Sequence, residues 1–286
     1  MDEFLLHERE WPASLADAPR AMLRRIVAGI RQNPALVGLA AGGSFRSGRM
    51  DEYSDLDLVV VVEPAASQEV RGKRAALAAA LGPLLASFTG EHVGEPRLLV
   101  CLYGPPPVHV DLKFVTPDDL AVRVETPTVL WDRDGRVRIA LAAGTAAWPE
   151  PDPQWIEDRF WIWVHYAASK IARGELFEAL DFIAFLRGQV LGPLSLKEAS
   201  AQPSGVRHVE KMASARARQM QETVARYDAR DLVSSVRAAV ALYRELRDHA
   251  GVEGLQRRSD AEEAAVHYLD SVARRLGNPD ALPTPG

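Results

Sequence analysis

The sequence predicts an α+β protein, in which a mixed sheet flanked by helices is followed by an all-α helical bundle. Three observations predict this order. Up to residue 147, short β-prone runs alternate with segments whose apolar residues recur at helical spacing. Residues 148–153 then carry three prolines, which argue strongly against regular structure. From residue 154 onward the periodic segments are helical. We therefore expect two domains, residues 1–147 and residues 153–286.

The first domain is expected to begin with a helix and to continue as a sheet. The helix is expected to end at Asn33-Pro34, because proline cannot continue it. Residues 55–62 are apolar on both faces after their start, so this strand should lie centrally in the sheet. Gly82-Pro83 should kink or split the second helix. In chain order we expect a helix at 14–33, strands at 36–41 and 55–62, a helix at 66–88, and an antiparallel pair of strands at 97–103 and 108–115. Runs at 126–133 and 137–141 flank the turn Asp134-Gly135, and the second run is expected to be a strand or the start of an irregular segment.

The second domain is expected to consist of helices separated by glycine, proline and polar residues. Gly174 should interrupt the first pair, and Gly192-Pro193 should end the second helix. Trp155, Trp163 and Tyr166 form an aromatic stripe that we expect to lie mainly in the core. The expected helices are 154–173, 175–191, 206–226, 229–249 and 260–275.

Composition excludes several classes of protein. The chain of 286 residues is long enough for two ordinary domains, and its 47% hydrophobic and 26% charged residues are typical of soluble globular proteins. A net charge of −5 argues against a nucleic-acid partner, whose binding surface is usually basic. No apolar run approaches the length of a membrane span, and the acidic first ten residues do not resemble a secretory signal. We therefore expect a cytoplasmic protein without a membrane partner, whose one cysteine, Cys101, is buried.

Three aspartates carry the strongest chemical signal. Asp55 and Asp57 lie two residues apart where a strand begins, so they project from the same face. Two neighbouring carboxylates repel unless a cation lies between them, and Mg²⁺ prefers such oxygen ligands. An aspartate pair can also simply cap a loop. Asp111 argues against that interpretation, because it lies within an apolar strand where an unpaired carboxylate is costly.

A glycine turn precedes the aspartates and is a candidate phosphate cradle. Glycine lets the backbone of Gly43 approach an anion closely, and the Ser44 hydroxyl can donate to a phosphate oxygen. Arg46 follows in the same loop and either reaches a phosphate or is solvated. A glycine turn alone is a weak signal, but this one is followed after ten residues by Asp55.

Together, Gly43-Ser44, the Asp-x-Asp pair and the later Asp111 resemble the nucleotidyltransferase superfamily, whose fold is that of DNA polymerase β. The likeness is greatest to the aminoglycoside and lincosamide nucleotidyltransferases of antibiotic resistance, and it is sharp over residues 36–63. The resemblance implies that Asp55, Asp57 and Asp111 bind Mg²⁺, with Asp111 as a ligand or as the general base. It also implies that the chain transfers a nucleoside monophosphate, AMP from ATP in the first instance, to a hydroxyl of a small molecule and releases pyrophosphate.

The helical domain offers weaker candidates. By analogy with the antibiotic enzymes, Lys170 is the first candidate for a triphosphate contact, with Arg173 next. The carboxylates Glu157, Glu175 and Asp181 are alternative bases, although each taken singly is more typical of a solvated or ion-paired helix residue.

Two polar neighbours of Asp111 and several functions stay open at this stage. His109 on the same strand face favours a structural role, and Lys113 either assists Asp111 or forms a cross-strand ion pair. One alternative function is a nucleotidyltransferase that acts on a protein or an RNA end. Another is a catalytically silent nucleotide-binding or toxin–antitoxin interaction module. The sequence selects neither the acceptor nor an oligomeric state.

Overall fold

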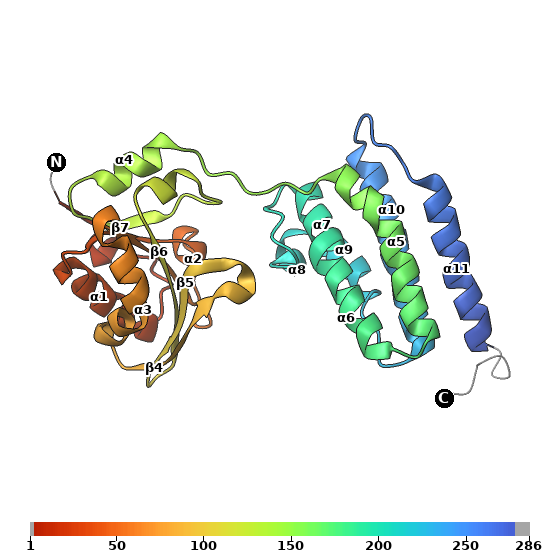
Figure 1. Cartoon of the computed structure of the whole chain (residues 1–286), viewed down its shortest axis with the longest axis horizontal. Coiled ribbons are helices and arrows are strands. Elements are labelled where there is room, and N and C mark those ends of the chain that lie inside the picture. The colour runs from red at the N-terminus through yellow and green to blue at the C-terminus, as the bar shows by residue number, and fades with distance from the viewer. Residues whose placement is uncertain (1–2, 278–286) are drawn as a thin grey trace. The chain divides into compact units, whose positions relative to one another are not determined.

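The computed structural model describes residues 3–277. The chain divides into two compact units, Met1–Trp148 and Pro149–Gly286 (Figure 1). The first contains a mixed sheet with flanking helices and the second contains helices, so the predicted fold class is confirmed.

In the described part of the first unit the sheet has seven strands, in the order β1-β7-β2-β3-β6-β5-β4. β3 and β6 run parallel to each other, and the other neighbours are antiparallel. The parallel pair lies near the middle of the sheet, as the apolar sequence of β3 predicts. The strands are β1 (Phe4–Leu5), β2 (Leu36–Ala41), β3 (Leu56–Val62), β4 (Leu84–Gly90), β5 (Glu95–Tyr103), β6 (Val108–Val115) and β7 (Thr128–Asp132).

Helices cover one face of this sheet fully and the other face in part. α1 (Asp17–Gln32) and α3 (Ser67–Leu81) pack on the first face, where Leu23, Ile26 and Leu58 are almost inaccessible to solvent. On the second face, α4 (Arg136–Ala143) and the short helix η4 (Asp118–Ala121) cover the apolar second half of β3. Asp57, at the start of β3, lies on that second face, and Asp55 immediately precedes the strand.

Two predictions for the first unit were wrong. Residues 66–88 are not one helix, because Gly82-Pro83 ends α3 and the chain returns as β4. Residues 137–141 lie in α4, whereas the sequence suggested a strand or an irregular segment. The buried carboxylate of Asp132 explains the helix, since it accepts hydrogen bonds from the backbone N–H groups of Gly135 and Arg138 at 3.0 and 3.1 Å.

The helical unit follows the predicted order with two differences. Residues 206–226 do not form one helix, because they hold two short helices, α8 (Val209–Met212) and α9 (Ser214–Gln221), that are separated at Ala213. Gly192-Pro193 does not end the second helix, because five residues of π-helix (Arg187–Leu191) join α6 to α7 and the proline falls in the first turn of α7. The helices are α5 (Pro153–Ala172), α6 (Leu176–Leu186), α7 (Gly192–Glu198), α8 (Val209–Met212), α9 (Ser214–Gln221), α10 (Ala229–Ala250) and α11 (Ser259–Gly277).

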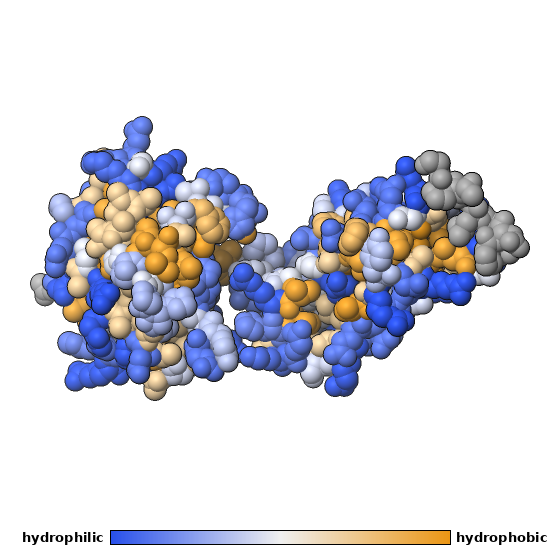
Figure 2. All heavy atoms as spheres, turned by 90° about the horizontal axis from the view of Figure 1, so that it is seen from below, coloured by the Kyte–Doolittle hydropathy of each residue, from blue (hydrophilic) through white to orange (hydrophobic). Residues whose placement is uncertain are grey.

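The stretch Leu176–Glu198 is long and apolar enough to span a membrane by length and composition, which the sequence analysis did not anticipate. An 18-residue window within it has a mean hydropathy of 1.2, and half of that window is buried. That burial is typical of a core helix. Hydrophilic residues are spread over the face of the helical unit that Figure 2 shows.

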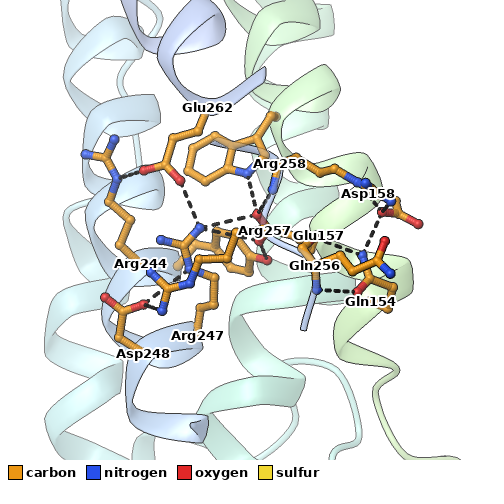
Figure 3. Close-up of polar contacts among 12 residues, drawn as sticks. Gln154, Glu157, Asp158, Arg244, Arg247, Asp248, Gln256, Arg257, Arg258 and Glu262 are labelled. Carbon is orange, nitrogen blue, oxygen red and sulfur yellow. Dashed lines mark hydrogen bonds and ion pairs between the residues drawn. The ribbon is translucent and has the colours of Figure 1, made fainter. Parts of the chain in front are cut away.

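A buried carboxylate joins α5, α10 and the start of α11 (Figure 3). Glu157 is inaccessible to solvent and accepts hydrogen bonds from the Tyr243 hydroxyl at 2.6 Å and the Arg258 backbone N–H at 3.0 Å. The guanidinium of Arg247 lies 3.3 Å from Glu157 and also pairs with Glu262 at 2.8 Å. Burial alone would raise the pKa of Glu157, but these hydrogen bonds outweigh it and hold the pKa below its ordinary value of 4.5. Glu157 is thus a structural residue of the bundle.

Replacing Glu157 by glutamine should therefore destabilise the chain. We expect Glu157→Gln to lower the free energy of unfolding by about 2–4 kcal/mol at neutral pH, because Arg247 loses a buried partner. Urea unfolding followed by far-ultraviolet circular dichroism measures this loss. A carboxylate with a lowered pKa stabilises the fold above its ordinary pKa, so the deficit should shrink as the pH falls below 4.5. The neighbouring, more exposed Asp158 is the control, and Asp158→Asn should cost less than about 1 kcal/mol.

Candidate active site

The parallel pairing of β3 with β6 brings the predicted carboxylates together. In this register Asp57 lies directly beside Asp111. Neighbouring strands are about 4.8 Å apart and directly paired side chains share a face, so the two carboxylates lie side by side. Asp55 immediately precedes β3 and is half-buried. The sequence motif thus becomes a compact acidic group on the open part of the second face.

A histidine completes this group. Ligand atoms of Asp55, His109 and Asp111 all lie within 4.8 Å of one another, close enough to hold one metal ion. His109 Nε2 lies 3.0 Å from Asp111 Oδ1. The sequence favoured a structural role for His109, although the two-residue spacing from Asp111 was a usable signal of a shared face. Two carboxylates suit Mg²⁺, and an imidazole is also accepted by Mn²⁺ and later transition metals.

The glycine turn packs against Asp57. Gly43 has a φ of +52°, a left-handed conformation that favours glycine, and a Cβ there would lie 2.0 Å from Asp57 Oδ2. The backbone N–H of Gly42 donates to the carbonyl oxygen of Asp57 at 2.9 Å. Ser44 Oγ is buried without a hydrogen-bond partner among the described residues. A buried hydroxyl without a partner is costly, so Ser44 fits the position of a donor to a phosphate oxygen.

Glu125 is the site residue that the sequence did not indicate. One of its carboxylate oxygens accepts the backbone N–H of Gly43 at 2.8 Å, and the other pairs with Arg46 Nε at 3.2 Å. Glu125 lies in the connection between η4 and β7, where no pattern in the sequence marks it. Arg46 therefore lies at the turn, where its side chain pairs with the carboxylate of Glu125.

Lys113 takes the structural one of its two predicted roles. Its ammonium group pairs across the strands with Glu95 at 2.7 Å. Hydrogen bonds from Arg97 first and also from Lys113 outweigh partial burial and lower the pKa of Glu95 to about 2. Lys113 is thus engaged with β5 rather than with Asp111.

The candidates of the helical unit are paired within that unit. Lys170 Nζ lies 2.5 Å from Glu175 and 5.1 Å from the centre of the Tyr166 ring. The hydrogen bond with Glu175 raises the pKa of Lys170. Arg173 pairs with the same Glu175 at 2.9 Å. These contacts form a junction at the end of α5.

The sheet, the glycine turn and the acidic group agree with a nucleotidyltransferase domain. Residues 23–90 match the family model described as "Nucleotidyltransferase domain", and this match includes most of α1, the turn, Asp55 and Asp57. The prediction of a nucleotidyltransferase is therefore confirmed. Asp111, Glu125 and the helical unit lie outside the matched residues.

Two solved structures resemble the chain over most of its length. An aminoglycoside 6-adenyltransferase from Bacillus subtilis is 14% identical, with 94% of this chain and 99% of that chain covered and a TM-score of 0.37. A nucleotidyltransferase-like protein from Exiguobacterium sibiricum 255-15 is 11% identical, with 90% and 88% covered and a TM-score of 0.35. Both TM-scores are below 0.5. No curated protein matches the sequence.

The glycine turn makes a direct prediction, because two glycines share the left-handed conformation but not the surroundings. A Cβ at Gly43 would collide with Asp57, whereas a Cβ at Gly48, whose φ is +65°, would meet nothing within 4 Å. We expect Gly48→Ala to lower the free energy of unfolding by about 1 kcal/mol and Gly43→Ala by about 2 kcal/mol or more. Urea unfolding of the two variants measures the difference. Equal losses would show that Gly43 and Asp57 are not in contact.

Proposed function

We propose that the chain catalyses the Mg²⁺-dependent transfer of a nucleoside monophosphate, AMP from ATP, to a hydroxyl of a small molecule. The observation that carries this proposal is the position of Asp57, which touches the glycine turn on one side and pairs with Asp111 on the other. A phosphate at the turn and a metal at the carboxylates would then be neighbours. The proposed location is the cytoplasm, where nucleoside triphosphates are available.

Each residue of the group has a proposed task. Asp55, Asp57 and Asp111 hold Mg²⁺, with His109 as a neighbour that can also ligate. When bound, the metal neutralises the phosphates and stabilises the leaving pyrophosphate. Gly43 and Ser44 donate to phosphate oxygens, and Arg46 supplies positive charge. The acceptor oxygen forms a bond to the α-phosphorus as the bond to the pyrophosphate oxygen breaks. Asp111, or His109 hydrogen-bonded to it, takes the hydroxyl proton.

The order of the strands supports an assignment of sides. In-line displacement requires the attacking hydroxyl and the leaving pyrophosphate to lie on opposite sides of the phosphorus. The turn follows β2, on one side of β3, whereas Asp111 lies on β6, on the other side. The pyrophosphate therefore belongs on the β2 side, and the acceptor should approach over β6, β5 and β4.

Two apolar side chains are exposed beside the carboxylates on that acceptor side. Register places Phe88, Val100, Asp111 and Asp57 in one row across β4, β5, β6 and β3. Phe88 is 56% exposed, and Leu102, in the next row beside His109, is 41% exposed. These side chains favour an acceptor that presents an apolar surface next to its reactive hydroxyl. An aminoglycoside-like compound is one candidate acceptor, because the carboxylates would attract its cationic groups. A protein or RNA end is the alternative acceptor.

Nucleotide binding tests the metal site before any acceptor is known. Titration calorimetry should show that the chain binds ATP at least about tenfold more tightly with Mg²⁺ than with EDTA, because the metal bridges carboxylates and phosphates. Asp57→Asn should lose this Mg²⁺-dependent gain while keeping its circular dichroism spectrum. Asp118→Asn, at an exposed aspartate of η4, removes the same charge elsewhere and should bind as the parent does. If the parent chain binds ATP equally well with Mg²⁺ and with EDTA, the proposed function is wrong.

A screen of hydroxyl compounds by pyrophosphate release tests the acceptor side. With an active acceptor, Phe88→Ser should raise the KM for that acceptor about tenfold and leave kcat nearly unchanged, because the apolar contact is made before and during the reaction. Ile139→Ser, at an exposed apolar residue of α4, is the control and should change neither constant. An unchanged KM in Phe88→Ser would remove β4 from the acceptor site.

A further inference from the structure

Glu125 occupies the place in the glycine turn where the proposed function puts a phosphate. Its carboxylate accepts the N–H of Gly43 and pairs with Arg46, which are the donors that an anion would use there. A Cβ at Gly42 would lie 2.5 Å from Glu125 Oε1, so the carboxylate packs directly on the backbone of the turn. A phosphate and this carboxylate cannot accept the same N–H at the same time.

The segment that carries Glu125 is firmly anchored. Two residues earlier, Arg123 donates to the carbonyl oxygens of Leu120, Leu141 and Gly144 at 2.6–2.9 Å. Two residues later, Pro127 is buried at the start of β7. The position of the backbone at Glu125 is thus set by the fold, and only the side chain needs to move to free the turn.

Ser44 provides an independent sign that the turn is built for another occupant. Its hydroxyl is buried and has no hydrogen-bond partner among the described residues. Glu125 accepts the neighbouring N–H of Gly43 but does not bond to this hydroxyl. A carboxylate has two acceptor oxygens, and both are engaged with Gly43 and Arg46. A phosphate group has a further oxygen that the Ser44 hydroxyl could reach, so it would satisfy the turn more fully.

We propose that Glu125 is an internal competitor of the triphosphate, which fills the cradle in the nucleotide-free chain and must be displaced when nucleotide binds. The proposal rests on the proposed function, since it takes the turn as the phosphate site. The apparent affinity for the triphosphate is then the intrinsic affinity multiplied by the fraction of molecules in which Glu125 has left the turn. The ion pair is partly exposed, with 43% of the Arg46 side chain and 29% of the Glu125 side chain accessible, so the effect is moderate. Glu125 thereby sets the concentration of nucleotide at which the site fills.

Titration of the full chain with two probes, Mg²⁺–ATP and inorganic tripolyphosphate, tests the competition. Glu125→Ala should bind both probes about three- to tenfold more tightly than the parent. Tripolyphosphate has no base or ribose, so a gain with this probe places the effect at the phosphates. Glu69→Ala removes the same charge from an exposed ion pair on α3 and should bind as the parent does. A melting curve confirms that both variants are folded.

Other outcomes would overturn the proposal in distinguishable ways. Unchanged binding by Glu125→Ala, with a parent that binds, would show that the carboxylate and the phosphates do not compete. Weaker binding would make Glu125 a residue that positions the turn. If neither the parent nor Glu125→Ala binds either probe, the proposed function fails together with the inference. If only Glu125→Ala binds, the competition is stronger than we infer and the proposal stands.

Discussion

The parallel pairing of β3 with β6 is the constraint on which the first unit depends. It places Asp57 directly beside Asp111, and such a pair of carboxylates is unfavourable without nearby positive charge or donors. The fold supports this arrangement with an apolar sheet, which α1 and α3 cover on one face and α4 covers in part on the other. The acidic group lies where that second cover ends. Asp55, Asp57 and Asp111 are therefore half-buried rather than enclosed in the core.

The glycine turn packs against the same acidic group. Gly43 adopts a left-handed conformation that brings its backbone against Asp57, and its N–H donates to the carboxylate of Glu125. The carboxylate of Glu125 thus satisfies the N–H of Gly43 and the guanidinium of Arg46. The Ser44 hydroxyl is the exception, and it is the group that most clearly fits a ligand. On the proposal that this turn binds phosphate, binding exchanges one anion for another.

The helical unit uses charge for a different purpose. Glu157 is buried and held by Tyr243, Arg247 and the backbone of Arg258, so its carboxylate joins distant segments of the bundle. Lys170, Arg173 and Glu175 form an ion-paired junction at the surface. These residue types looked similar in the sequence, where Glu157 and Glu175 were equal candidates for a base. Burial separates them, because a fully buried carboxylate with several donors is a structural element.

The sequence by itself determined the order of elements around the aspartates, the class of protein and the proline-rich segment 148–153. These features are encoded locally, in two-residue and helical periodicities and in turn residues. It missed β4 and α4, where a Gly-Pro pair and the carboxylate of Asp132 decided the local structure. Only the tertiary structure brought His109 into the acidic group and Glu125 to the turn. Glu125 is 82 residues from Gly43, and a contact over that separation is fixed by strand order and register, which local patterns do not contain.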